Sequence, residues 1–411
     1  MKNSGICLLG LLITVSSIAV AQGVVTPDSD PCSLPRLKAT VDWPQTGLTP
    51  CHTGYNPYEF VLSPATVPNL TLHWQYTAGD LLIWAPAVAN GVVYVASYDA
   101  TLHALNASTG VQLWQRTHVA VNAPAVAKGL VYCAAGRVVY ALNAATGAVV
   151  WTRSMGDFID DSPTVADGVV YVGSGNAINA LDAATGAPLW QYVTGELVDS
   201  TPAVANGIVY VGSNDNYLYA LNASRGAFLW KFRTGSIVAS SPAVANGVVY
   251  FGSEDHHLYA LDAASGNLLW QYATGDVIDS SPAVANGVVY IGSSDNSVYA
   301  LNATTGARLW YYQTFESVVS SPAVANGVVY VGSADDDMYA LNAATGALLW
   351  SYRADFVIQS SAAVVNGMMF IGSNDRKLYA FGLLLRLSDP PEVRGFQDGR
   401  IFRDWSPFGQ Q

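Results

Sequence analysis

One ten-residue segment recurs through most of the chain and limits the possible folds more than any other feature. In its clearest form it reads Ser-Pro-Ala-Val-Ala-Asn-Gly-Val-Val-Tyr, at residues 241–250. Its proline returns every 38 to 40 residues, at Pro86, Pro124, Pro163, Pro202, Pro242, Pro282 and Pro322, and Ala362 takes its place in an eighth copy. A length of 411 residues alone suggests two or three domains. The repeat instead predicts one array of eight equal units.

Each unit is predicted to contain four short strands and no helix. In the copy that begins at 241, strands are expected at 241–245, 248–252, 258–261 and 268–272. The first two are joined by Asn246-Gly247, a pair that favours the tight turn of a β-hairpin because both positions need a positive φ. Four antiparallel strands in about 40 residues are typical of a β-propeller blade. The sequence therefore predicts an all-β, eight-bladed propeller.

The phase of the repeat predicts that the ring closes. The chain starts with a fourth-strand element at 72–76 and ends after a third-strand element at 378–381, so the first element can complete the last blade. An open solenoid is the alternative, but it would need atypical capping units at both ends, and the sequence has none. The propeller is expected to span 71–382.

A tryptophan stands at one fixed place in every unit, within the pattern Ala-x-Asn/Asp-x-x-Thr/Ser-Gly-x-x-x-Trp. Residues 180–190, 260–270 and 340–350 are clear copies. The pattern resembles the tryptophan-docking motif of the pyrroloquinoline-quinone (PQQ) propeller family, over about residues 71–382. The resemblance implies that each tryptophan packs between neighbouring blades, which also suits a large amphipathic ring at a fixed position. These residues are Trp74, Trp114, Trp151, Trp190, Trp230, Trp270, Trp310 and Trp350.

The family includes quinoprotein dehydrogenases and non-catalytic scaffolds of the BamB type, so the fold does not choose between them. The enzymes hold PQQ and Ca²⁺, often under a ring made by two adjacent cysteines, and use an aspartate base. This chain has no Cys-Cys pair and no long insertion between units, and it lacks GxSxG, HExxH and phosphate-loop motifs. No cofactor is therefore expected. Should the chain be an enzyme after all, PQQ and Ca²⁺ are the cofactors implied, with Asp160 or Asp161 as the base.

The N-terminus has the features of a secretory signal peptide. Lys2 precedes an apolar stretch from 6 to 20, and Ala19-Val20-Ala21 suits cleavage after residue 21. A membrane anchor is the alternative, but the stretch is shorter than a span requires. We therefore expect a protein without a transmembrane segment, exported to the periplasm or outside the cell. Residues 22–70 form a lead-in segment, and 383–411 a tail that either packs on the ring or stays free.

Three cysteines remain after cleavage: Cys32, Cys51 and Cys133. An oxidising compartment favours a disulfide. We predict the pair Cys32–Cys51, which flanks one loop-like segment, and a buried thiol at Cys133 within a strand.

The charge balance disfavours nucleic acid as a partner. With 18 Lys and Arg against 30 Asp and Glu, the formal net charge is −12, whereas nucleic-acid binding needs a basic surface. Aspartates recur in the turns between second and third strands, and further acidic residues recur in the links between units. These two sets share one face of a propeller. That face is predicted to be acidic and to attract cations or a basic partner, although turn preference explains each aspartate alone.

Differences between units mark a candidate site. Two residues before the proline, five units carry serine, whereas the first three carry Trp84, Asn122 and Asp161. One residue earlier stand Asp160, Asp199, Asp279 and Gln359, where other units are apolar, and a shortened turn carries Arg137. These eight residues form the predicted ligand or partner face; an aromatic ring beside carboxylates and an amide suits a planar ligand or Ca²⁺. Neutral drift with local packing is the alternative.

Together these features predict an exported, monomeric, non-catalytic propeller that binds a protein or cell-envelope partner. A small PQQ- and Ca²⁺-dependent alcohol dehydrogenase is the second hypothesis, and carbohydrate or cell-surface binding is a weaker third.

Overall fold

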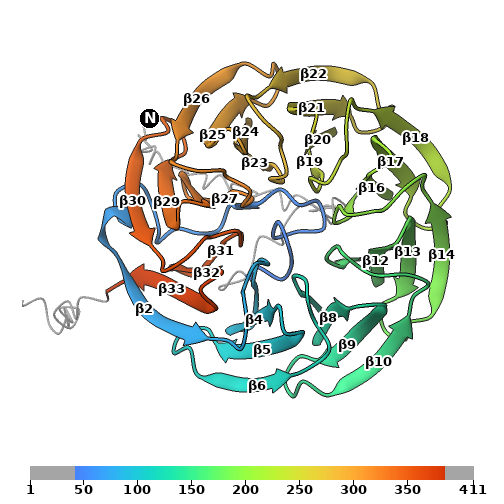
Figure 1. Ribbon diagram of the computed structural model, residues 1–411, viewed down its shortest axis with the longest axis horizontal. Coiled ribbons are helices and arrows are strands. Elements are labelled where there is room, and N and C mark those ends of the chain that lie inside the picture. Colours follow the sequence, from blue (N-terminus) through green and yellow to red (C-terminus); the bar gives the residue numbers. More distant parts are fainter. Residues whose placement is uncertain (1–41, 385–411) are drawn as a thin grey trace, which may run out of the picture.

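The computed structural model describes residues 42–384, which form a closed ring of eight blades (Figure 1). Each blade is a four-stranded antiparallel sheet whose first strand lies at the central channel and whose fourth lies at the rim. The predicted all-β, eight-bladed propeller is confirmed. The signal peptide, Cys32 and most of the tail lie outside the described residues.

The strands of blades 1 to 4 follow one another along the chain. They are β3 (Ala87–Ala89), β4 (Val92–Ser97), β5 (Thr101–Asn106) and β6 (Gln112–Arg116); β7 (Ala125–Ala127), β8 (Leu130–Ala135), β9 (Val138–Asn143) and β10 (Val149–Ser154); β11 (Thr164–Ala166), β12 (Val169–Ser174), β13 (Ala177–Asp182) and β14 (Pro188–Val193); β15 (Ala203–Ala205), β16 (Ile208–Ser213), β17 (Tyr217–Asn222) and β18 (Phe228–Arg233).

Blades 5 to 8 repeat this order, except that the outer strand of blade 8 comes from the start of the chain. They are β19 (Ala243–Ala245), β20 (Val248–Gly252), β21 (His257–Asp262) and β22 (Leu268–Ala273); β23 (Ala283–Ala285), β24 (Val288–Ser293), β25 (Ser297–Asn302) and β26 (Arg308–Gln313); β27 (Ala323–Ala325), β28 (Val328–Gly332), β29 (Asp337–Asn342) and β30 (Leu348–Arg353); β31 (Ala363–Val365), β32 (Met368–Gly372), β33 (Lys377–Leu383) and β2 (Leu70–Thr77).

The ring closes as the repeat predicts. Strand β2 pairs antiparallel with β33, from Leu70 opposite Leu383 to Thr77 opposite Lys377. The start of the propeller thus supplies the rim strand of its last blade, and β33 is paired on both sides, with β32 and β2.

Tryptophans join the blades to one another. Seven of the eight donate their ring N–H to an alanine carbonyl of the next blade, as Trp270 does to Ala303 at 3.0 Å. The glycine of the following turn lies against the ring: a Cβ on Gly306 would stand 2.7 Å from Trp270. Trp350, before the closing blade, instead packs against Tyr352 and Phe381.

The two faces of the ring differ in what they carry. One face carries the links between blades and the turns between second and third strands, and we call it the link face. The opposite face carries the tight Asn-Gly hairpins, such as Asn286-Gly287 with φ of 50° and 78°, and we call it the hairpin face.

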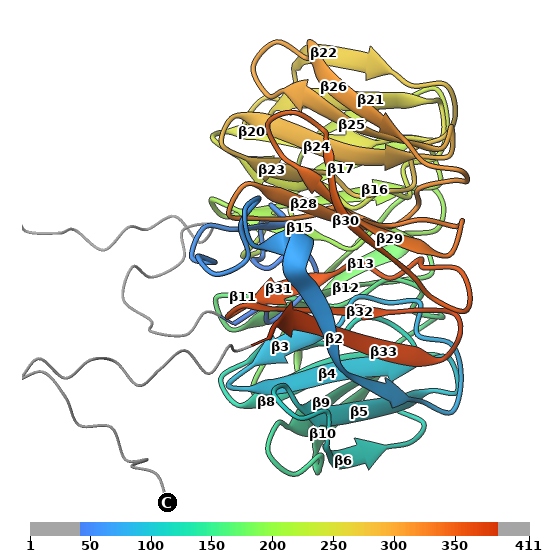
Figure 2. The same cartoon turned by 90° about the vertical axis from the view of Figure 1, so that its left-hand side faces the viewer.

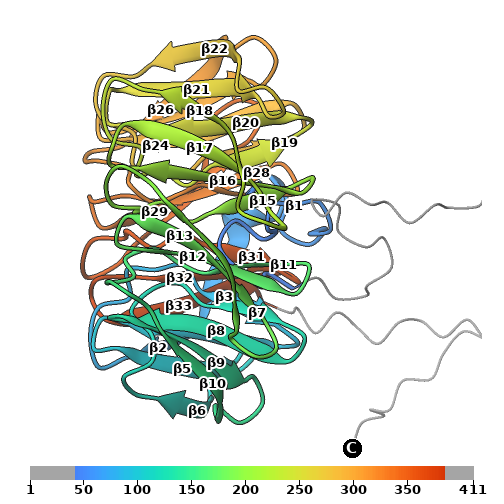
Figure 3. The ribbon, with the colours of Figure 1, turned by 90° about the vertical axis from the view of Figure 1, so that its right-hand side faces the viewer.

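A segment of the lead-in, residues 43–56, fills the central channel, and we call it the plug. The side views show it within the ring, among the inner strands (Figures 2 and 3). It contacts every blade at the central valine of the inner strand. Backbone carbonyls of the plug accept the N–H of Val88, Val126, Val204, Val244, Val284 and Val324, the Gln45 side chain accepts that of Val165, and Asn56 donates to the carbonyl of Val364.

At the end of the plug, β1 (Tyr55–Asn56) pairs in parallel with β27. The chain then passes blades 7 and 8 through η1 (Val67–Asn69) to the rim. Glu59 fixes this passage, since its carboxylate accepts the N–H groups of Val61, Leu62 and Gly367. The plug therefore satisfies a backbone group at the centre of each inner strand that would otherwise be open at the channel.

Candidate functional site

The three residues before the proline of each repeat approach the channel from the link face. Because side chains alternate along an extended chain, the first and third of them point into the channel, and the second points back into its own blade. The inward-pointing positions line a funnel of about 160 Å³ at the mouth of the channel, with Thr46 of the plug at its floor. Its wall includes Asp199, Asp279 and Gln359 at the first of the three positions; Trp84 and Asp161, although they stand at the second position, also border it.

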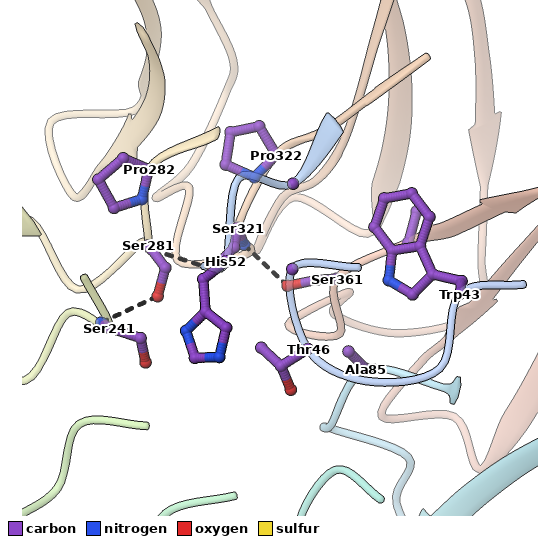
Figure 4. Close-up of a pocket in the computed structure, with 13 residues that line it drawn as sticks. Trp43, Thr46, His52, Ala85, Ser241, Ser281, Pro282, Ser321, Pro322 and Ser361 are labelled. Atoms are coloured by element: carbon purple, nitrogen blue, oxygen red, sulfur yellow. Dashed lines mark hydrogen bonds between the residues drawn. The ribbon is translucent and has the colours of Figure 1, made fainter. Parts of the chain in front are cut away.

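Hydroxyl groups form a girdle around the funnel, directly before the prolines of blades 3 to 7 and before Ala362 of blade 8. Each hydroxyl oxygen accepts a hydrogen bond, at 2.9 to 3.4 Å, from the backbone N–H of the residue at the same position in the preceding blade. The six residues are Ser162, Thr201, Ser241, Ser281, Ser321 and Ser361. Four of these serines surround Thr46 and His52 in Figure 4. Ala85 and Ala123 interrupt the girdle in blades 1 and 2, so this side of the funnel has no hydroxyl.

The backward-pointing position has a structural task. In blades 4 to 8 its serine hydroxyl accepts the N–H of a strand glycine in the same blade, as Ser240 does from Gly252 at 3.1 Å. Asn122 does the same with Ala134, at 3.3 Å, and also donates to the Asp161 carbonyl. It is buried and does not line the funnel.

Asp161 performs the same task with a carboxyl group. Both carboxylate oxygens accept the Gly173 N–H, at 3.0 and 3.2 Å, and the residue is 2 % exposed. Burial raises the pKa of Asp161 well above its usual range, and the nearby carboxylates of Asp199 and Asp160 raise it further. No basic side chain lies among the residues that line the funnel.

The remaining carboxylates of this region also repel one another. Burial, with the negative charge of Asp276, raises the pKa of Asp279. Burial and the carboxylates of Asp279 and Asp199 raise that of Glu254. Asp199 accepts a hydrogen bond from Asn214, and Gln359 accepts one from Asn374. The funnel is thus a site of unbalanced negative charge that a cation would neutralise.

Trp84 supplies the aromatic wall of the funnel. Its backbone carbonyl accepts the hydroxyl of Ser360 at 3.0 Å, which fixes it across the closing seam. Its ring N–H is buried and has no hydrogen-bond partner in residues 42–384. An aromatic face beside carboxylates is a common environment for organic cations.

Two other predicted residues lie outside the funnel. Arg137 pairs with Asp157 at 3.4 Å and stacks over Phe158, 4.7 Å from its centroid. Asp160 is exposed beside the funnel and does not line it; burial and the charges of Asp199 and Asp157 raise its pKa. The structure therefore brings together five of the eight predicted residues.

The acidic turns of the link face have mainly structural contacts. In blades 4 to 8 the turn aspartate accepts the hydroxyl of a tyrosine four residues on and a backbone N–H of the link before its blade. Asp295 illustrates this with Tyr299 at 2.7 Å and Gly275 at 2.7 Å. These carboxylates hold each link against its blade.

Sequence reasoning missed the floor of the site. His52 is buried there, with Nε2 3.1 Å from the Thr164 hydroxyl, and burial lowers its pKa to about 4, so the ring is neutral at pH 7.

Cys51 is disulfide-bonded, but Cys32 lies outside the described residues, so their pairing stays a prediction. Cys133 is a buried free thiol, as expected. Within residues 42–384 no group of three or more His, Cys, Asp or Glu side chains is placed to hold a metal ion.

The charge of Asp161 leads to a stability prediction. Its pKa is higher in the folded than in the unfolded chain, so the folded protein binds more protons, and stability falls as pH rises from the unfolded pKa through the folded one. Asp161→Ser, the residue of blades 4 to 8, should remove this loss and raise the melting temperature at pH 7 by roughly 2–4 °C. Thermal unfolding between pH 4 and 8 tests this; a melting temperature of the variant below that of the parent at pH 7 would contradict it.

Two family models match the chain. Residues 155–391, more than half of the chain, match the model described as "Beta-alanine-activating enzyme, beta-propeller", and residues 69–177 match "Outer membrane protein assembly factor BamB". The chain belongs to the first of these β-propeller families. The resemblance of this propeller to PQQ-like repeats is thereby confirmed. No curated protein matches its sequence.

Solved structures share the fold of this propeller at low identity. Quinohemoprotein alcohol dehydrogenase ADHIIG from Pseudomonas putida HK5 has 17 % identity and a TM-score of 0.73, over 84 % of this chain and 80 % of that one. BamB from Moraxella catarrhalis has 21 % identity and a TM-score of 0.66, over 77 % and 98 %. A europium-containing methanol dehydrogenase has 14 % and 0.72, over 83 % and 98 %. Such identities show the fold and leave the function open.

In the part of the chain that the structure describes, no helix is long and apolar enough to cross a membrane.

Proposed function

We propose that the protein is an exported, non-catalytic propeller that binds a protein partner on its link face, with a basic side chain of the partner in the funnel. The supporting observation is the funnel itself, which Asp199 and Asp279 line together with Trp84, with Asp161 buried behind them and no basic group in the lining. A lysine or arginine inserted there would gain the carboxylates and the aromatic face together.

Exposed aromatic rings on the same face support a protein partner. Phe315 and Phe356, in the links that lead into blades 7 and 8, are 84 % and 55 % exposed, and Phe158, before blade 3, is 55 % exposed. Aromatic side chains of this kind are enriched at protein interfaces, where they supply most of the buried area. A partner that covers them would hold its basic residue over the funnel.

The residues of the funnel do not fit PQQ. This cofactor carries three carboxylates, and a site for it needs cations or metal ions to balance them. The funnel offers hydroxyls, an amide and the carboxylates of Asp199 and Asp279, with that of Asp161 buried behind them. The carboxylates would repel the cofactor. The second hypothesis, a quinoprotein alcohol dehydrogenase, therefore rests on the fold alone, and no step of such a reaction is derived.

A peptide titration tests the proposed function. An acetylated pentapeptide with a central arginine between leucines should bind the protein 22–411, and the same peptide with neutral citrulline should bind at least about tenfold more weakly. Calorimetry at low salt suits this measurement because exposed charge interactions are screened at high salt. Equal affinity for the two peptides would contradict the proposal.

Variants locate the peptide. Asp199→Asn with Asp279→Asn should weaken arginine-peptide binding by about tenfold or more, because both carboxylates of the funnel wall are neutralised. Glu196→Gln with Glu316→Gln is the matched control, since it removes two exposed carboxylates of the links on the same face, outside the funnel lining. An equal loss with both proteins would show a general charge effect and would refute binding in the funnel.

A further inference from the structure

Aromatic pairs fill the outer part of six of the eight seams between blades. In each, a ring on the rim strand of one blade packs against a ring on the third strand of the next, with centroids 5.3 to 5.9 Å apart. The pairs are Tyr76–His103, Tyr192–Tyr219, Phe232–Tyr259, Tyr272–Tyr299, Tyr312–Tyr339 and Tyr352–Tyr379.

The seam between blades 2 and 3 has lost both rings. Arg153 of β10 stands at the rim-strand position, and Asn179 of β13 stands at the third-strand position. The seam between blades 1 and 2 differs less, because Arg116 there still faces a ring, Tyr140. Only the second seam therefore lacks the volume of two aromatic side chains.

A cavity of about 410 Å³ lies at this seam. Its lining includes Arg153, Met155, Asn179, Leu189 and Trp190. Its size falls within the range of small-molecule sites, roughly 300–1,000 Å³. Its walls combine apolar groups with a few fixed polar ones, as such sites do.

The cavity has two kinds of polar group: amides that hydrogen bonds hold in place, and a guanidinium without a bonded partner among residues 42–384. Asn179 is 6 % exposed, donates to the Ala177 carbonyl at 3.2 Å and accepts from the Gln191 amide at 3.1 Å. The guanidinium of Arg153, by contrast, makes no hydrogen bond or ion pair with any residue of the described chain. The cavity thus presents one free cation beside a fixed amide pair.

We propose that this seam binds a carboxylate carried on an aromatic ring. The ring would occupy the volume that a tyrosine pair fills in the other seams, packed between Met155 and Leu189. The carboxylate would accept two parallel N–H bonds from the Arg153 guanidinium, a geometry that lysine cannot provide. This site lies at the rim and is independent of the funnel in the channel.

Phenylacetate is a suitable test ligand, with phenylacetamide as its neutral isostere. Ligand-observed NMR on the protein 22–411 should detect phenylacetate binding in about the millimolar range, as expected for a ligand of ten heavy atoms. Phenylacetamide should bind at least about tenfold more weakly. No binding of phenylacetate at about 20 mM, or equal binding of the two compounds, would overturn the proposal.

Three variants separate this site from a mere packing defect. Arg153→Met should lower phenylacetate affinity by about tenfold. Asn179→Tyr should restore an aromatic side chain to the seam, abolish binding and leave the melting temperature unchanged or higher. Tyr192→Met with Tyr219→Asn opens the corresponding space between blades 3 and 4 without an arginine at the rim-strand position, and in an Asn179→Tyr background it should not restore binding. Unchanged affinity in Arg153→Met, which is expected to fold because the residue lies at the rim, would refute the assignment on its own.

Discussion

Replacing Trp270 with alanine is expected to lower the free energy of unfolding by about 3–5 kcal/mol, the usual cost of removing a large buried ring. Trp270 is 9 % exposed, packs against Tyr250 and donates its N–H to the next blade. Urea denaturation of the variant and parent measures the difference. A loss below about 1 kcal/mol would contradict a docking role, because a value that small is typical of surface substitutions.

Two glycines provide a matched control for this contact. Gly306 and Gly287 both have positive φ, at 71° and 78°, so alanine costs each about 1–2 kcal/mol of backbone strain. At Gly306 the new Cβ would also stand 2.7 Å from Trp270, whereas at Gly287 it would meet nothing within 4 Å. Gly306→Ala should therefore be less stable than Gly287→Ala by about 1–3 kcal/mol. Equal losses would show that the turn does not clamp the tryptophan.

Removing the plug is expected to have the second large effect. A chain that begins at Pro57 keeps β2 and the closed ring but loses the contacts of residues 43–56 with all eight inner strands. Each of these hydrogen bonds is worth about 0.5–1.5 kcal/mol, so the melting temperature should fall by roughly 10 °C. Calorimetry on the purified chain measures the shift.

A chain that begins at Asp42 is the control for this truncation. It keeps every plug contact described above and loses only the residues before it, including Cys32. Its stability relative to 22–411 gives the contribution of those residues and of any disulfide to Cys51. If the two truncated chains melted at the same temperature, the plug would have no stabilising role.

The sequence was sufficient for the architecture because a propeller repeats its constraints eight times. The Asn-Gly turns, the prolines and the tryptophans each fix one local feature, and their constant spacing fixes the ring. The plug could not be predicted in this way. It has no repeat, and most of its contacts are backbone hydrogen bonds that any residue can make.

The candidate site was predictable only where one blade differs from the others. Asp199, Asp279 and Gln359 differ from apolar residues at the same position, and they do line the funnel. The hydroxyl girdle was missed because its serines are shared by most blades and looked like part of the packing. Asn122 was assigned to the site although it only replaces a serine that caps a backbone N–H. The cavity between blades 2 and 3 could be predicted only by placing Arg153 opposite Asn179. That placement requires the register between the two blades, which the sequence alone does not provide.

The central claim is that the funnel receives a cationic group and no quinone. Its most direct test is one calorimetric series in which the protein 22–411 is titrated with the arginine pentapeptide and, separately, with PQQ in the presence of Ca²⁺. We predict saturable binding of the peptide that Asp199→Asn with Asp279→Asn weakens by about tenfold, and no binding of PQQ. Saturable binding of PQQ with dye-linked oxidation of simple alcohols, and none of the peptide, would contradict the account.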